Sequence, residues 1–124
     1  MNLLLIALAG GLGALARYGL TGLVHRIPGM SLPWGTAVVN ILGCLVFGLI
    51  WGVSENRMGI QPEHRLIVLV GFVGSFTTFS TFIFEVGMQV RDNQWFAVLG
   101  NMVGQNVIGV LALLVGFFLS RLAA

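Results

Sequence analysis

The chain has 124 residues; 57% are hydrophobic, 8% are charged, and the formal net charge is +2. Soluble domains carry about 25% charged residues, so this composition excludes a soluble globular protein and predicts an all-α integral membrane protein. The six arginines are scattered without a basic run, which excludes nucleic acid as a partner.

Four stretches are apolar enough to cross a lipid bilayer, which takes about 20 residues of helix. We expect them at about Leu3–Val24, Trp34–Val53, Leu66–Val90 and Trp95–Leu119, which makes residues 1–124 a single four-helix transmembrane domain. The first stretch lacks a basic leader and a small-residue cleavage site, so we expect a membrane span and not a signal peptide.

The first stretch combines small residues with one embedded charge. Gly10, Gly11 and Gly13 leave room for another helix to approach closely. Arg17 follows them, and two interpretations stay open for it. Its guanidinium either extends to the membrane interface, or it raises the positive potential of an aqueous vestibule and attracts anions.

The second stretch carries one amide and one thiol. Asn40 lies well inside the span, where its amide either bonds to a neighbouring helix or donates to an ion on a permeation path. Cys44 is the only cysteine, so no intrachain disulfide can form, and we expect a small buried side chain there.

The third stretch is the least lipid-like of the four. Between Gly71 and Glu85, hydroxyl side chains alternate with phenylalanines, and hydroxyls and carboxylates are costly in hydrocarbon unless they face protein, water or an ion. We therefore expect the third helix to break in mid-membrane, around Gly74 to Thr78. Such a break frees carbonyl oxygens, which would coordinate a small cation or pair with the same segment of a second subunit.

Aromatic rings follow the predicted break. Phe79 and Phe82 are three residues apart and would share a helix face. Thr77, Thr81 and Glu85 recur every four residues and would form a polar stripe beside that face. Aromatic residues at this spacing are more often packing than function. With the hydroxyl stripe beside them, however, the positive ring edges would replace the water of a dehydrated anion without trapping it.

The fourth stretch has Gly100 and Gly104 at a spacing typical of close helix packing. Asn101 and Gln105 lie one turn apart, and we expect interhelical amide bonds from them, with a role in a pore lining left open. The two histidines lie in separate loops, where we expect no metal site. No nucleophile constellation, phosphate loop or pair of catalytic carboxylates occurs, so we expect no enzyme.

The arginines give almost no orientation signal. With four spans, both termini lie on one side of the membrane, and three arginines lie there too: Arg57, Arg65 and Arg121. Arg26 and Arg91 lie on the other side, and Arg17 is nearest to it. Because positive loops normally stay in the cytoplasm, this balance predicts copies that insert in both orientations and pair antiparallel, unless the small bias suffices for one orientation.

Three motifs, in this order, resemble the Fluc (CrcB) family of fluoride channels. Gly13-x-x-x-Arg17-Tyr18 resembles the family's first-helix motif, and Gly35-Thr36-x-x-x-Asn40 resembles its second. Thr77-Thr78-Phe79-Ser80-Thr81-Phe82-x-x-Glu85 resembles the hallmark motif of its third helix. The resemblance covers the whole chain, including its length and its four-span layout.

The resemblance implies an antiparallel, dual-topology homodimer in the bacterial cell inner membrane, with two pathways that conduct fluoride passively out of the cytoplasm. The pore residues that it implies are Phe79, Phe82, Asn40, Ser80 and Thr81. Gly74 and Thr77 would hold a structural sodium ion through backbone carbonyls from both subunits. Arg17 and Glu85 match motif positions as supporting residues.

The fourth span departs from the family pattern. Many members carry a tyrosine and serines along its pore-facing side, where this chain has Asn101, Gln105 and Gly109. The path along this helix therefore stays undefined at the level of the sequence.

Our leading hypothesis is a fluoride-selective channel, and two other functions stay open. Fluoride is small and strongly hydrated, so a narrow path of ring edges, hydroxyls and an amide would have to replace its water. A dual-topology four-helix proton-coupled small-multidrug-type exporter would instead need an embedded carboxylate, and Glu85 is the only candidate. A non-transporting assembly or regulatory subunit would conduct nothing by itself.

Overall fold

The computed structural model describes residues 2–56 and 59–123, and every regular element in these ranges is helical. Four helical segments are long and apolar enough to cross a membrane: Asn2–His25, Trp34–Asn56, Pro62–Arg91 and Trp95–Leu122. The four predicted spans are therefore confirmed, each extended by a few residues. Arg57, one of the arginines weighed for orientation, lies outside the described residues.

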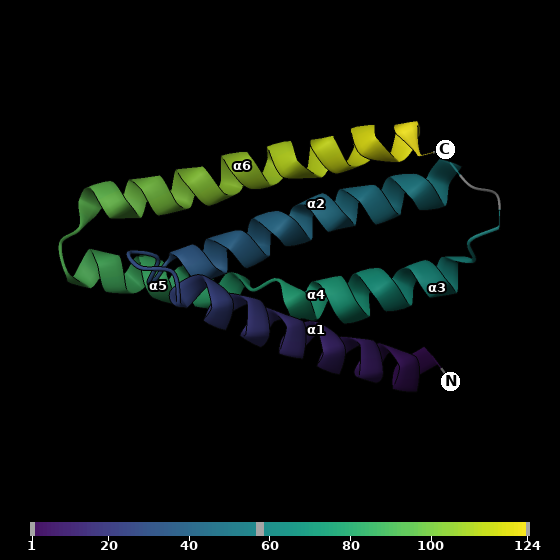
Figure 1. Cartoon of the computed structure of the whole chain (residues 1–124), viewed down its shortest axis with the longest axis horizontal. Coiled ribbons are helices and arrows are strands. Elements are labelled where there is room, and N and C mark those ends of the chain that lie inside the picture. The colour runs from purple at the N-terminus through teal and green to yellow at the C-terminus, as the bar shows by residue number, and fades with distance from the viewer. Residues whose placement is uncertain (1, 57–58, 124) are drawn as a thin grey trace.

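Three of the segments are continuous helices and the third is not. Helices α1 (Asn2–His25), α2 (Trp34–Asn56) and α6 (Trp95–Leu122) run unbroken. The third segment is divided into four elements: α3 (Pro62–Leu66), η1 (Ile67–Val73), α4 (Gly74–Phe76) and α5 (Phe79–Arg91). Figure 1 shows α2 beside α6, α1 crossing the third segment, and both termini at the same end, as an even number of crossings requires.

Helices α2 and α6 pack backbone against backbone because glycines leave room at their contact. A methyl group on Gly48 would overlap the carbonyl of Leu113, and one on Gly116 would overlap the carbonyl of Leu45. The predicted close packing at Gly100 and Gly104 is wrong for the described subunit, since a methyl group on either would meet no described atom within 4 Å.

The first half of the third segment packs closely against α1. A methyl group on Gly13 would overlap the Phe72 carbonyl, and one on Gly71 would crowd Ala9 and Ile6. The small residues predicted for helix contact in α1 therefore serve that purpose at Gly13 and at Gly10, where a methyl group would lie 3.2 Å from Ser75 Oγ, whereas a methyl group on Gly11 would meet no described atom within 4 Å. Element η1 is a π-helical turn, a wide and rare form that the sequence did not predict.

The helix breaks at two residues, Thr77 and Thr78. Both have extended backbones, with φ −82° and ψ 161° at Thr77 and φ −149° and ψ 115° at Thr78. The predicted break is confirmed, but Gly74 is helical and takes no part in it. Because Thr77 precedes the break, it cannot share a helical stripe with Thr81 and Glu85, and that part of the prediction is wrong.

Candidate functional site

The break is held by one side chain from α2. The backbone N–H of Thr78 donates to Asn40 Oδ1 at 2.8 Å, and Asn40 Nδ2 donates to the Thr78 carbonyl at 3.1 Å. A single amide thus satisfies both backbone groups of a residue that lies outside any helix, where an unpaired group would be costly. The predicted interhelical bond of Asn40 is confirmed, while its role on an ion path stays a prediction.

A cavity of about 250 Å³ opens beside this clamp, and we call it the aromatic cavity. Its lining brings together three predicted pore residues with side chains from α6: Asn40, Cys44, Thr77, Thr78, Phe79, Phe82, Gln105 and Asn106. The rings of Phe79 and Phe82 lie 5.8 Å apart between centroids and are inclined at 47°. Phe82 is 5% exposed, whereas Phe79 is 74% exposed at the outside of the subunit.

The two predicted pore hydroxyls, Ser80 and Thr81, gather around Thr78 and do not line the aromatic cavity. Thr78 Oγ1 donates to Thr81 Oγ1 at 2.9 Å and lies 3.5 Å from Ser80 Oγ. Thr78 Oγ1 also accepts from the backbone N–H of Thr81 at 3.3 Å, which caps α5. Thr78 therefore orders the start of α5, a role that the sequence did not predict for it.

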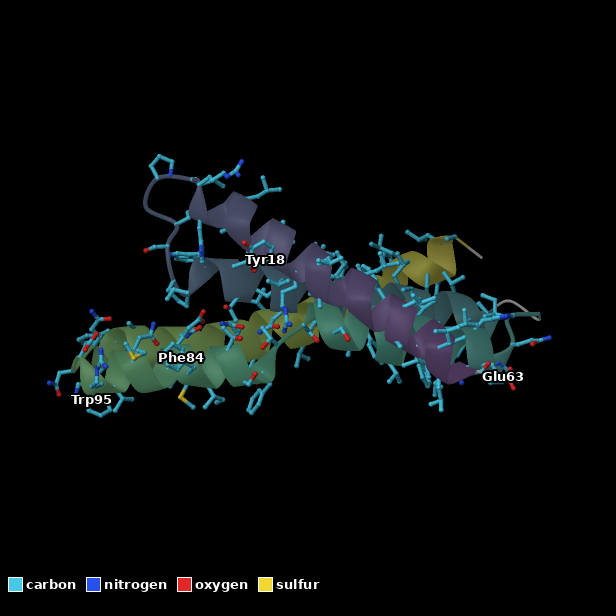
Figure 2. All side chains as sticks on the ribbon, turned by 90° about the horizontal axis from the view of Figure 1, so that it is seen from below. Tyr18, Glu63, Phe84 and Trp95 are labelled. Carbon is cyan, nitrogen blue, oxygen red and sulfur yellow. The ribbon has the colours of Figure 1, made fainter. Side chains whose placement is uncertain are left out.

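A second, larger cavity lies between α1 and the starts of α2 and α5, with a volume of about 570 Å³. Arg17, His25, Arg26 and Thr81 are among its lining residues. Arg17 Nη1 also donates to the Thr77 carbonyl at 3.4 Å, so this arginine reaches the break. Of the two interpretations of Arg17, this arrangement favours the positively charged vestibule. In Figure 2, α1 diverges from the third segment near the labelled Tyr18.

Glu85 is hydrogen-bonded to Thr36 of α2, which also lines the larger cavity. It is 3% exposed, and Thr36 Oγ1 donates to its Oε1 at 2.5 Å. Its other oxygen, Oε2, is buried and has no hydrogen-bond partner among the described residues. Thr36 belongs to the second-helix motif and Glu85 to the third-helix motif. Their hydrogen bond therefore joins the two motifs.

The backbone at the break supplies oxygen donors of the kind that hard cations bind. In an unbroken helix the N–H of Thr78 would donate to the carbonyl of Gly74, but it donates to Asn40 instead. The Thr77 carbonyl points away from its own helix and accepts the 3.4 Å bond from Arg17 with one of its two lone pairs. A small cation held by the carbonyls of Gly74 and Thr77 stays a prediction, and Arg17 places a positive charge near one of them.

Side-chain amides continue from Asn40 into α6 and back to α5. Asn40 Nδ2 donates to Gln105 Oε1 at 2.9 Å, Gln105 Nε2 donates to Asn101 Oδ1 at 2.7 Å, and Asn101 Nδ2 donates to Gln89 Oε1 at 3.4 Å. The predicted interhelical amide bonds of the fourth span are confirmed. The sequence did not predict a role for Gln89 in this set, although its position four residues after Glu85 places it on the same face of α5.

These features define a multi-pass membrane protein with four membrane-length helices, the third of them interrupted beside aromatic, hydroxyl and amide side chains. Comparison with known families identifies the family of membrane proteins to which the chain belongs. The family model described as "CrcB-like protein, Camphor Resistance (CrcB)" matches residues 4–117, and the chain belongs to that family.

Several curated relatives match over nearly their whole length. A protein of Solidesulfovibrio magneticus is 53% identical over 117 residues, which cover 94% of each chain, and one of Nitrosococcus oceani is 50% identical over 117 residues, again 94% of each. A protein of Nitratidesulfovibrio vulgaris is 49% identical over 121 residues, which cover 98% of each chain. All three relatives are named "Fluoride-specific ion channel FluC".

Proposed function

We propose that the chain is a fluoride-selective ion channel. The observation that carries this proposal is the meeting of Asn40, Phe79 and Phe82 around one cavity at the helix break, in a chain whose relatives are named fluoride channels. None of the residues that line this cavity is charged. Ring edges and amide groups would therefore replace the water of a small anion weakly enough to release it again.

Flux through reconstituted protein tests the proposal. Proteoliposomes loaded with fluoride or chloride are opened to anion flow, and the released ion is followed with an ion-selective electrode. We expect rapid fluoride release and little chloride release. Phe79→Ile and Phe82→Ile should each slow fluoride release by about tenfold or more without changing assembly, because they remove ring edges from the path.

Phe96→Ile provides the matched control. Phe96 is 93% exposed at the start of α6 and lines none of the cavities described above. Its replacement should leave fluoride release unchanged. Normal release from both cavity variants would contradict the assigned roles, and equal release of fluoride and chloride would contradict selectivity.

The proposal includes an antiparallel, dual-topology homodimer with two pathways. Non-helical backbone inside a membrane is tolerated where protein buries it or where it lines a cavity, and the Thr77–Thr78 break lies beside the exposed Phe79. A second copy of the chain would cover this face. Labelling a terminal tag from each side of the membrane tests the arrangement, since a single orientation would refute it.

A structural sodium ion would join the two breaks. The carbonyls of Gly74 and Thr77 from both subunits would hold it, and the ion would supply a fixed positive charge where the two segments meet. Replacing sodium by N-methylglucamine should lower the thermal stability of the dimer. A stability that does not depend on sodium would remove the ion from the proposal.

We place the channel in the bacterial inner membrane, where an inside-negative potential drives an anion outward without further energy. The work is about 2.3 kcal/mol per elementary charge for each 100 mV. Fluoride release that follows voltage and ignores a proton gradient fits this proposal. Release that requires a proton gradient would favour the exporter alternative, for which Glu85 is the buried carboxylate among the described residues.

A further inference from the structure

His25, the last residue of α1, is exposed and lines the larger cavity of about 570 Å³, the vestibule. Its imidazole rests against the backbone of α2. A methyl group on Gly35 would lie 2.7 Å from His25 Nε2 and 2.7 Å from Thr21 Cγ2, so the ring occupies the space that a side chain at position 35 would need. The histidine is therefore seated in the wall of the vestibule, and the proposed function gives it no task so far.

The vestibule is lined by cationic and neutral side chains. Arg17, Arg26 and His25 belong to its lining, which contains no aspartate or glutamate among the described residues. The salt bridge found in the described part of the chain joins Arg91 to Asp92, so neither vestibule arginine is neutralised by one there. Arg17 precedes His25 by eight residues and lies about 12 Å deeper along the helix. Two arginines thus give the cavity a lasting positive charge, and His25 decides whether it gains a third.

A buried acid lies within electrostatic reach of the same histidine. Thr36, the neighbour of Gly35, lines the vestibule and donates to Glu85 Oε1. Glu85 is buried, and its Oε2 has no hydrogen-bond partner among the described residues. His25 is close enough for its charge to act on this carboxyl group. A protonated His25 would therefore offset a buried negative charge as well as add a positive charge to the vestibule.

Histidine is the side chain whose charge normally changes between about pH 5 and pH 8. The other charged or titratable groups around His25 are Arg17, Tyr18 and Arg26 on the α1 side and Glu85 on α5, while α2 contributes Thr36, which does not titrate. Arginine side chains keep their charge in this range, and a tyrosine hydroxyl titrates in alkaline solution. A proton taken up by either His25 or Glu85 makes the surroundings of the vestibule more positive.

We infer that His25 attracts anions in its protonated form, so that the vestibule admits fluoride faster in acidic than in alkaline solution. The inference rests on the proposed channel function. A positive charge in a cleft with apolar walls raises the local concentration of anions and their rate of entry. The proton changes only the field at the entrance, so the effect needs no proton gradient, and this separates it from proton-coupled export.

Fluoride release at equal pH on both sides of the membrane tests the inference. Proteoliposomes of neutral lipid give the ratio of initial release at about pH 5.5 to that at about pH 8, after release from protein-free vesicles is subtracted. We expect a ratio of about two to three for the wild type at low ionic strength and about one for His25→Gln. His64→Gln is the matched control, because it removes the chain's other histidine, which lies in α3 outside the vestibule lining, and should keep the wild-type ratio.

His25→Lys separates the charge from the shape of the ring. A permanent positive charge should raise release at about pH 8 to near the wild-type level at about pH 5.5 and bring the ratio to about one. A purely structural histidine predicts no such gain. The wild-type protein gives a further test that needs no variant to fold: at about 1 M salt, where screening acts within about 3 Å, its ratio should also approach one.

A wild-type ratio near one at low salt overturns the inference, and so does a ratio that stays at two to three in His25→Gln. A ratio that survives in His25→Gln and disappears in Glu85→Gln would assign the proton to the buried acid instead of the histidine. Absence of wild-type release at both pH values overturns the channel function itself, which distinguishes the two failures.

Discussion

The two halves of the third segment are held in place by different forces. The first half, Pro62 to Phe76, packs on α1 through backbone contacts that Gly13 and Gly71 make possible. The second half, α5, is tied to its neighbours by polar side chains, with Glu85 bonded to Thr36 of α2 and Gln89 bonded to Asn101 of α6. The break at Thr77 and Thr78 separates the two.

Under the proposed function, we expect the first half to act as scaffold and the second half to meet ions. Lipid is as apolar as leucine, so close backbone packing is what holds apolar helices together in a membrane. Polar contacts in the same environment are kept where polar chemistry is needed. The cavities lined by Phe79, Phe82 and Gln89 all lie against α5, after the break. Substitutions in the two halves should accordingly affect different properties.

Asn40→Leu should have the largest effect, because it removes the clamp between the halves. The N–H and carbonyl of Thr78 and the Gln105 amide all lose a partner. Each buried group left unpaired costs about 1–3 kcal/mol, so we expect a lower melting temperature and loss of fluoride release. Asn106→Leu is the control, because this exposed amide bonds to Met102 of its own helix, and its melting temperature should change little. Equal melting temperatures for the two variants would show that the clamp contributes nothing.

Gly13→Ala should affect the scaffold half and leave the chemistry intact. The added methyl group would overlap the Phe72 carbonyl and push α1 away from η1, at a cost of about 1–3 kcal/mol. Fluoride release per reconstituted protein should stay near that of the wild type, while the melting temperature falls. Gly11→Ala on the same helix meets no described atom within 4 Å and should be neutral or stabilising by up to about 1 kcal/mol. A stable Gly13→Ala protein would contradict the packing role of the first half.

The sequence predicted features that depend on local chemistry. The four spans follow from hydropathy alone, and the break near Thr78 follows from hydroxyls crowded into an apolar run, so both were found. Phe79 and Phe82 share a cavity as their spacing suggested. Each of these inferences needs only neighbouring residues along the chain.

Features that depend on a distant partner were not predictable. The break falls at Thr77 and Thr78, and not at Gly74, because Asn40 lies 38 positions away along the chain and engages Thr78. Gln89 is engaged by a hydrogen bond from Asn101 of a different helix, and nothing in the sequence links these two residues. The π-helical turn of η1 accompanies the contact of Gly71 with Ile6 and Ala9, which lie in a different helix.

Arg17→Gln should have the smallest effect on stability. It changes the side chain that donates to the Thr77 carbonyl, at the break between the two halves. Glutamine keeps a donor for the Thr77 carbonyl, and the existing bond is long at 3.4 Å, so we expect a change under about 1 kcal/mol. The vestibule loses one positive charge, which should slow fluoride entry by about two- to threefold at low ionic strength. Because salt screens such a field within about 3 Å at 1 M, the difference from the wild type should vanish there. A defect that persists at high salt would mean that Arg17 acts through the hydrogen bond to the break and not through its charge.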